Sequence, residues 1–306
     1  MEPVQPRLTL GPYSAGDLVL LRSVVPLHPG VGRGGEEVDL AIQRDGLGFP
    51  IIYSSSIKGA LKSMIWRLDQ RKANLLLGPE TEEEKFASAL SILDCFLLIM
   101  PVRSLVGIYA FLTTPLLLRR FYEIMDFAEA VGIKNLKELK DSVRQVLKDS
   151  DGLKESTIVS SSDKLKVDAL NGKLVINEEL WLQPIEKDSV EDLESKLKIE
   201  KGRLVVVNDD SGLSAINRSI LRVTRVRIGR ETKTVEGRGL WTEEHVPHDA
   251  FFYTVFFYSR SYNEALDSAD KVRNEIRGLI NEFGNYLIIG GHETVGRGIV
   301  KLKFWG

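Results

Sequence analysis

Residues 18–68 read LVLLRSVVPLHPGVGRGGEEVDLAIQRDGLGFPIIYSSSIKGALKSMIWRL and decide the fold. The stretch begins with an apolar run, Leu18 to Leu27, that is typical of a buried strand. A glycine-rich loop and a polar segment without a sustained period follow, as far as Gly48. Beyond Ser54, apolar residues recur at helical spacing and predict a helix with one buried face: Ile57, Ala60, Leu61, Met64, Ile65 and Leu68.

The start of this helix has the composition of an anion site. The serines at positions 54–56 are candidate N-caps, and Lys58 adds a positive charge. Unpaired N–H groups at a helix start also attract phosphate through the helix dipole. Gly59 favours binding over plain capping, because a glycine in the first turn costs about 1 kcal/mol relative to alanine and lets a ligand approach the backbone. Lys62 lies one turn further along the helix.

The rest of the chain predicts an α+β fold. We expect strands at Leu105–Leu112, Phe251–Tyr258, Leu287–Ile289 and Ile299–Phe304. We expect helices at Leu116–Ala130 and Tyr262–Phe283. Residues from about 133 to 201 are richer in Lys, Glu, Asp and Ser and are interpreted as an insertion, although their charges are equally typical of a solvated face. For 306 residues this order favours one elaborated domain, residues 1–306, built on an antiparallel sheet of ferredoxin-like type.

Composition limits the classes of function. The net charge is −2, from 41 basic and 43 acidic side chains, so an RNA site has to arise from local clusters of Lys and Arg. A single cysteine, Cys95, excludes an intrachain disulfide and a cysteine-based zinc site and favours a reducing, cytoplasmic location. The most apolar stretch, Leu90–Val102, contains Asp94 and is too short to span a bilayer. No signal peptide and no membrane partner are expected.

Two glycine loops and one alternating segment are candidates for RNA contact. The loop Gly30–Gly35 matches G-x-G-x-x-G, but no helical period follows it and position 55, about twenty residues on, is a serine rather than an acid. We therefore reject a dinucleotide fingerprint there. The loop Gly290–Gly298 lacks the ending of a P-loop and favours a groove for an RNA backbone, with Arg297 as its cation. Residues 220–235 alternate like a hairpin, with Arg225 and Arg227 on one side.

An acidic residue in the polar loop is the candidate for catalysis. A mobile carboxylate, such as that of Asp39, suits metal-assisted or general acid–base cleavage of RNA, in which a 2′-hydroxyl can attack the phosphate. The alternative is that Asp39 caps a turn or pairs with Arg44. All four histidines, at positions 28, 245, 248 and 292, fall in or beside loop segments. These residues alone do not decide between catalysis and local structure.

Taken together, these motifs resemble the RAMP superfamily of CRISPR proteins, and within it the backbone (Cmr-type) subunit of the type III-B effector complex. The resemblance covers about residues 15–130 and 203–304 and is carried by Pro26–Gly30, Val38–Asp45, Gly48–Pro50, Ser55–Leu61, Leu98–Val106, Gly239–Pro247 and Gly290–Gly298. Gln43-Arg44 after Asp39, and Pro101–Leu105, favour type III-B over type III-A. Ala41 stands where a proline is common, and Ser54 where a glycine often precedes the serine pair.

The resemblance implies an RRM-like domain with large insertions, one of which forms a β-hairpin thumb that bends a guide–target duplex. Residues 158–182 and residues 218–235 are both candidates for that thumb. Copies would stack into a filament along a guide (CRISPR) RNA, together with other subunits of the complex. Asp39, with a divalent metal such as Mg²⁺, would cleave single-stranded target RNA opposite each copy. His28 and either Glu243 or Glu244 match positions near that site.

The residues expected to bind RNA are Gln43, Arg44, Ser55, Ser56, Lys58, Gly59, Lys62, Arg225, Arg227, Gly290, Gly291, Gly296, Arg297 and Gly298. Two alternatives remain open. The chain could bind guide RNA without cutting, or it could be a type III-A backbone subunit or a stand-alone RNA-processing endonuclease of the same superfamily.

Overall fold

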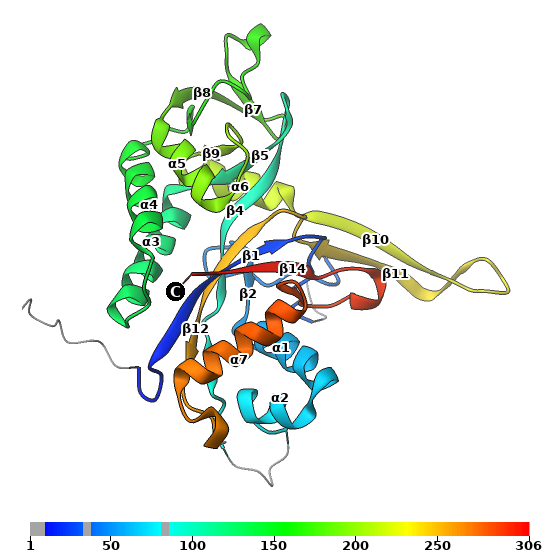
Figure 1. Cartoon of the computed structure of the whole chain (residues 1–306). Coiled ribbons are helices and arrows are strands. Elements are labelled where there is room, and N and C mark those ends of the chain that lie inside the picture. Colours follow the sequence, from blue (N-terminus) through cyan, green and yellow to red (C-terminus); the bar gives the residue numbers. More distant parts are fainter. Residues whose placement is uncertain (1–9, 33–37, 81–85, 263, 306) are drawn as a thin grey trace, which may run out of the picture.

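The computed structural model describes residues 10–32, 38–80, 86–262 and 264–305 (Figure 1). Its centre is an antiparallel sheet in which neighbouring strands come from distant parts of the chain. In order across the sheet the strands are β13 (Tyr286–Ile288), β14 (Ile299–Trp305), β1 (Ala15–Ser23), β12 (Phe251–Tyr258) and β4 (Cys95–Ser104). Two short strands complete it, with β2 (Ile51–Ile52) on β4 and β3 (Leu90–Ile92) on β12.

Strand β1 shows why the sheet has two hydrophobic faces. Side chains alternate along a strand, and Val19 and Leu21 enter one core while Leu18 and Leu20 enter the other. Strand β12 follows the same rule, and all of its residues are buried. Apolar residues of both parities are therefore required, which is why these strands read as continuous apolar runs rather than as alternating ones.

Different helices cover the two faces. The first core contains residues of α1 (Ser54–Leu68), α2 (Gln70–Leu77), α6 (Asp209–Ser219) and α7 (Ala269–Glu282). The second core contains residues of α3 (Pro115–Ala130), α4 (Lys137–Asp149) and α5 (Asp188–Leu197). Figure 1 shows α1, α2 and α7 together below the sheet, away from α3, α4 and α5. Among the described residues, no helix is both long and apolar enough to cross a bilayer.

The charged middle of the chain contributes three strands to a ring that closes on β4. The ring runs β4, β5 (Ile108–Thr113), β9 (Leu204–Val206), β6 (Thr157–Ser160), β8 (Leu180–Glu186) and β7 (Leu174–Ile176), and returns to β4 where Ser104 pairs with Ile176. The pairs β5–β9 and β6–β8 are parallel. The limits of an insertion at about 133–201 stay a prediction, and the strands from this segment continue the sheet.

A long hairpin leaves the body of the molecule. Within the described residues, β10 (Leu221–Ile228) and β11 (Val235–His245) form a separate sheet of their own, which projects away from the helices (Figure 1). The hairpin expected at residues 220–235 is confirmed, but its second strand begins where the expected segment ends. Of the two candidates for the thumb, this one stands clear of the body.

Three expected boundaries and one expected helix cap were wrong for local reasons. The strand expected at Leu18–Leu27 ends at Ser23, because the N–H groups of Val24 and Val25 both donate to the carbonyl of Ile299. The strand at Leu105–Leu112 begins at Ile108, after a turn at Gly107 with φ +75°. The helix at Tyr262–Phe283 begins only at Ala269, where the Ser268 side chain accepts from the N–H of Lys271. The serines do not cap α1: Tyr53 is its N-cap residue and makes no side-chain cap.

A buried ion pair fixes α7 to β1. Asp17 is fully buried, and its Oδ1 accepts from Nε and Nη2 of Arg273 at 2.9 and 2.6 Å. Its Oδ2 accepts from the hydroxyl of Tyr258 at 2.9 Å. Burial, followed by the charge of Asp17, raises the pKa of that Tyr258 hydroxyl well above its ordinary value. The carboxylate thus joins one helix and two strands.

Removing this carboxylate tests its structural role. We expect Asp17→Ala to lower the free energy of unfolding in urea by about 3–5 kcal/mol, because it leaves a partly buried guanidinium without its partner. The control is Asp267→Ala, which removes an exposed partner of Lys271 one helical turn away and should change the unfolding free energy little. Equal effects of the two substitutions would contradict the assignment.

Candidate nucleic-acid interface

The end of β11 organises the candidate site through two adjacent glutamates. Glu243 and Glu244 are 1% and 3% exposed, and they point to opposite sides because side chains alternate along a strand. Oε1 of Glu243 accepts from Nε1 of Trp241 at 2.7 Å, and Oε2 accepts from Nε of Arg225 at 3.2 Å and faces Nε2 of His245 at 3.1 Å. Burial alone would raise the pKa of Glu243, but these hydrogen bonds together hold it below the ordinary value.

Glu244 fastens the polar loop to the same strand. Both of its oxygens are held by the guanidinium of Arg44, at 2.8 and 3.1 Å, in a two-point pair. The N–H of Ile42 also donates to Oε2 at 3.4 Å. Burial favours a raised pKa for Glu244, but the hydrogen bond and charge of Arg44 outweigh it and lower that pKa. Arg44, expected to bind RNA, therefore has an internal partner.

Asp39 lies exposed beside this strand and is held in place by Thr242. Oδ2 of Asp39 accepts from the N–H of Thr242 at 2.8 Å and from its hydroxyl at 3.1 Å. The backbone of Leu40 forms a parallel bridge with Glu243. The sequence left open whether Asp39 pairs with Arg44. In the structure Arg44 pairs with Glu244, and the Asp39 carboxylate is exposed at the surface beside Thr242.

Three histidines gather over Glu243. The ring centroids of His28, His245 and His292 lie 4.8–5.7 Å apart, and Nε2 of His292 is 3.7 Å from Oε1 of Glu243. Nδ1 of His28 is 2.6 Å from the carbonyl of Glu244. A carbonyl only accepts, so Nδ1 is the donor in this contact. The fourth histidine, His248, lies outside this cluster and pairs with Asp249.

Burial shifts the titration of two of these rings. It lowers the pKa of His245 and of His292, and the opposing charge of Glu243 offsets the shift only in part. Among the described residues, Nδ1 of the fully buried His245 has no hydrogen-bond partner. Burial therefore favours the neutral form of His245 and His292.

The glycine loop Gly290–Gly298 is shaped mainly by its own chain. Gly290 has φ +83°, and a Cβ there would lie 2.3 Å from the carbonyl oxygen of His28. Gly298 has φ +87°, and a Cβ would lie 2.3 Å from the carbonyl oxygen of Ile289. Gly291 donates its N–H to His28, whereas Gly296 has open space around it. The loop thus closes over the histidines, and Gly296 is its accessible glycine.

The start of α1 differs from the expected phosphate site. Oε1 of Gln43 accepts from the N–H of Tyr53 at 2.7 Å, and Oδ1 of Asp94 accepts from the N–H of Ser54 at 2.7 Å. Nε2 of Gln43 donates to the carbonyl of Gly30 and to Oγ of Ser56. No sequence pattern indicated that Asp94, forty residues away in the chain, would reach this helix start. Gln43 therefore links the loop to the start of α1, and two N–H groups at this helix start already have hydrogen-bond partners within the chain.

The cations expected to bind RNA fall into two groups. Lys62 donates to the carbonyl of Gly78 and pairs with Glu80, and Arg225 is held by Glu243. Lys58 and Arg227 make no hydrogen bond or ion pair within the described chain. Burial, followed by the charge of Lys62, lowers the pKa of Lys58. Ser55 and Gly59 are exposed beside Lys58, and a Cβ on Gly59 would meet nothing.

Two further expectations concern residues near the loop. Arg297 is half-buried, and its Nε has no hydrogen-bond partner within the described part of the chain. The first glycine loop, Gly30–Gly35, extends into residues 33–37, which lie outside the described residues.

The described residues contain no group of three or more His, Cys, Asp or Glu side chains arranged to hold a metal ion.

Comparison with known proteins identifies the family. The sequence model of the RAMP superfamily matches residues 21–301. The chain belongs to the RAMP superfamily. It is 37% identical to the CRISPR system Cmr endoribonuclease Cmr4 of Pyrococcus furiosus over 306 residues, covering 93% of this chain and 94% of the relative. It is 30% identical to the CRISPR system CMR subunit Cmr4 of Saccharolobus solfataricus over 314 residues, with the same coverage.

Solved structures of similar chains agree with this assignment. A chain of the type III-B Cmr-beta complex bound to cognate target RNA superposes with a TM-score of 0.78 at 29% identity, covering 96% of this chain and 98% of that one. Oligomeric Cmr4 from Pyrococcus furiosus gives a TM-score of 0.65 at 28% identity, covering 95% and 97%. The expected family and the mixed α+β class are confirmed.

The histidine cluster generates a prediction about pH. An unfolded histidine binds a proton below about pH 6.5, whereas folded His245 and His292 resist protonation. The unfolded state then binds more protons, so stability falls as pH drops through that value. Glu243 has a lowered pKa, so its protonation reduces the stability of the fold only at a lower pH. We expect a lower urea unfolding free energy at about pH 5.5 than at about pH 7.5.

Replacing the buried ring isolates its contribution. His245→Gln keeps a donor toward Glu243 and removes one titrating group, so the difference between the two pH values should shrink. His248→Asn, at an exposed ring, is the matched control and should keep the wild-type difference. A His245→Gln protein with an unchanged difference would show that acid acts elsewhere in the molecule.

Proposed function

We propose that this chain is a backbone subunit of a type III-B CRISPR effector complex, in which it binds guide RNA as a filament of copies and cleaves complementary single-stranded target RNA at regular intervals. The observation that carries the proposal is the exposed Asp39 carboxylate, held against β11 by Thr242. The similarity to a Cmr endoribonuclease over 93% of the chain supports the activity. The similarities to a target-RNA-bound Cmr complex and to an oligomeric Cmr4 support RNA binding and self-association.

The order of elements supports a finer assignment of the fold. Segments β1–α1–β4 and β12–α7–β14 are each a strand, a helix and a strand, and they interleave in one antiparallel sheet. This is the order of a ferredoxin-like or RRM-like domain, with β10–β11 as the thumb. RRM-like sheets are a frequent platform for single-stranded RNA.

Asp39 has the properties that RNA cleavage requires of this chain. Its carboxylate is exposed, and Thr242 fixes its orientation through two hydrogen bonds. The Arg44–Glu244 pair and the Glu243 backbone bridge hold the loop on either side of it. A carboxylate placed in this way can accept the proton of a 2′-hydroxyl that attacks the adjacent phosphate.

A divalent metal ion would fit this site, coordinated jointly by the protein and the RNA. Mg²⁺ is usually held by one or two carboxylates, with waters and phosphate oxygens completing its shell, and the described residues offer no larger cluster. Asp39 would supply the protein ligand, and the metal would stabilise negative charge on the phosphate. Because guide RNA is made inside the cell, we place the complex in the cytoplasm. The buried, free Cys95 is compatible with a reducing compartment.

The test of catalysis is Asp39→Asn in the assembled complex with guide RNA, complementary RNA and Mg²⁺. Asparagine keeps an oxygen for Thr242 and removes the charge, so cleavage should fall by about a hundredfold or more with guide binding unchanged. Asp267→Asn, at an exposed acid just before α7, is the control. Unchanged cleavage in Asp39→Asn would leave the chain a guide-binding scaffold and move the active site elsewhere.

A second prediction concerns the guide strand. Lys58→Ala should weaken guide binding and reduce the slope of log affinity against log salt by about 0.7, the contribution of one phosphate contact on a single strand. Lys62→Ala is the matched control, because that ammonium is already held by Gly78 and Glu80. Fluorescence anisotropy across a salt series measures both. Equal slopes for wild type and Lys58→Ala would rule out a phosphate contact at this lysine.

A further inference from the structure

The carboxylate of Glu244 faces two guanidinium groups rather than one. Arg44 occupies both of its oxygens, at 2.8 and 3.1 Å. Nε of Arg222 lies 3.5 Å from Oε1, and the Arg222 side chain is 60% exposed whereas that of Glu244 is 3% exposed. Because arginine is always protonated in proteins, these three groups carry one net positive charge. Arg222 is the member of the group that presents this charge to solvent.

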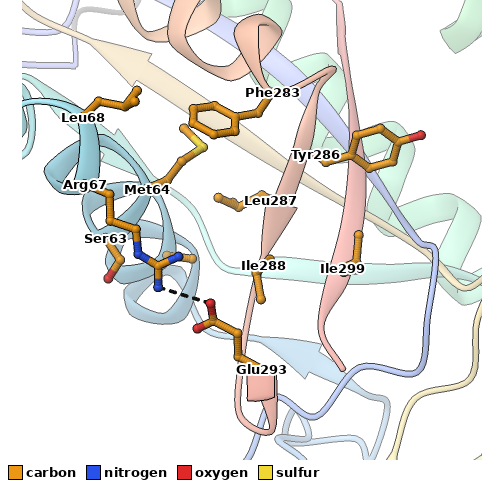
Figure 2. A pocket seen from close by; sticks show the side chains of 11 residues that line it. Ser63, Met64, Arg67, Leu68, Phe283, Tyr286, Leu287, Ile288, Glu293 and Ile299 are labelled. Carbon is orange, nitrogen blue, oxygen red and sulfur yellow. Dashed lines mark hydrogen bonds and ion pairs between the residues drawn. The ribbon is translucent and has the colours of Figure 1, made fainter. Parts of the chain in front are cut away.

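Two neighbouring arginines each have a carboxylate of their own. Arg67 of α1 reaches Glu293 at 3.1 Å, beside an apolar groove between α1 and β13 (Figure 2). Arg225 donates to Glu243 at 3.2 Å, on the opposite face of the hairpin from Arg222. Arg222 differs from both, because its acid is already held by Arg44. A guanidinium has five N–H donors, and within the described part of the chain none of those of Arg222 makes a hydrogen bond.

The pairing of strands places Arg222 and Asp39 on the same face of β11. Asp39 accepts from the hydroxyl of Thr242, and Thr242 and Glu244 share a face because they are two residues apart. Arg222 pairs directly across the hairpin with Glu244, and directly opposed residues share a face. The loop of Asp39 runs along the other edge of β11, where Leu40 is bridged. A carboxylate and a guanidinium therefore flank the end of β11 from its two edges.

We propose that Arg222 is a further catalytic residue, whose guanidinium contacts the scissile phosphate of the target RNA and stabilises the negative charge that develops there. The inference rests on the proposed function, because it assigns a second group to the cleavage in which Asp39 acts. In that step the 2′-oxygen bonds to phosphorus and its proton passes to Asp39. The bond from phosphorus to the 5′-oxygen breaks, and the leaving oxygen takes a proton from water.

The charges around Asp39 explain why such a cation is needed. A carboxylate by itself repels a phosphate, and the repulsion grows as negative charge accumulates on the phosphate oxygens. A guanidinium on the same face opposes this repulsion, and its planar fork can donate to two phosphate oxygens at once. The ion pair with Glu244 holds Nε of Arg222 on this face. A donor that is already in place costs little reorganisation when the charge develops.

Target cleavage by the assembled complex with guide RNA and Mg²⁺ tests this role. Arg222→Met keeps a long side chain and removes the guanidinium, so the single-turnover rate at saturating target should fall by about a hundredfold, as for the loss of one donor to a developing anion. The affinity for target should change far less. Arg222→Lys keeps the charge without the fork and should give an intermediate rate. Arg144→Met, at an exposed arginine of α4 paired with Asp141, is the control and should cleave at the wild-type rate.

Chemical rescue distinguishes direct contact from a structural effect. In Arg222→Ala, added methylguanidinium can replace the missing group, so the cleavage rate should rise with its concentration and then saturate. The free energy of unfolding in urea should stay close to that of wild type, because Arg222 is exposed and Glu244 keeps Arg44.

Four results would overturn the inference. The first is a wild-type cleavage rate for Arg222→Met. The second is a weaker affinity for target with an unchanged rate at saturation, which would make Arg222 a binding cation. The others are a slow Arg222→Ala whose rate does not respond to methylguanidinium, and a large loss of unfolding free energy in Arg222→Ala, which would assign the side chain to holding Glu244.

These outcomes separate the inference from the proposed function. If Asp39→Asn stops cleavage while Arg222→Met cleaves as fast as wild type, the role of Arg222 is wrong and the function stands. If the wild-type complex does not cleave complementary RNA, the proposed function itself fails.

Discussion

Two adjacent buried carboxylates at the end of β11 are the constraint on which the rest of the site depends. Burying a charge is costly unless it is paired and hydrogen-bonded, and Glu243 and Glu244 are both almost completely buried. Because side chains alternate along a strand, the two carboxylates point to opposite sides, and each is paired with different cations. Glu244 takes Arg44 from the polar loop, and Glu243 takes Arg225 and faces the histidines. Loop, hairpin and histidine cluster are thus held by one strand.

This arrangement favours different roles for the three acids. Both oxygens of Glu244 are occupied by Arg44, and both oxygens of Glu243 accept hydrogen bonds from neighbouring side chains. Carboxylates held in this way, with lowered pKa values, are poor proton acceptors and good anchors. Asp39 is exposed, and its Oδ2 accepts two hydrogen bonds from Thr242. The geometry therefore favours Asp39 for chemistry and the two glutamates for positioning it.

Sequence reasoning located what depends on local patterns. The strand at Phe251–Tyr258 and the helix ending at Ala130 follow from runs and periods of neighbouring residues, and both were located closely. The return of β7 to β4, and the reach of Asp94 to the start of α1, depend on contacts between distant segments. Such contacts leave no periodic signal. Gly290 was expected to admit RNA, yet its own backbone requires it, because a Cβ would collide with His28.

On the proposed function, a chain with a net charge of −2 has to hold RNA through a small number of local cations. Arg44, Arg225 and Lys62 neutralise or hydrogen-bond to groups of the same chain, so few of the cations predicted to bind RNA remain for phosphate. A single copy would then bind weakly and with a shallow salt dependence. Copies joined along one guide strand convert each further contact into an intramolecular one, which raises the overall affinity without any new cation. On the proposed function, weak sites in each copy are sufficient because the copies are linked.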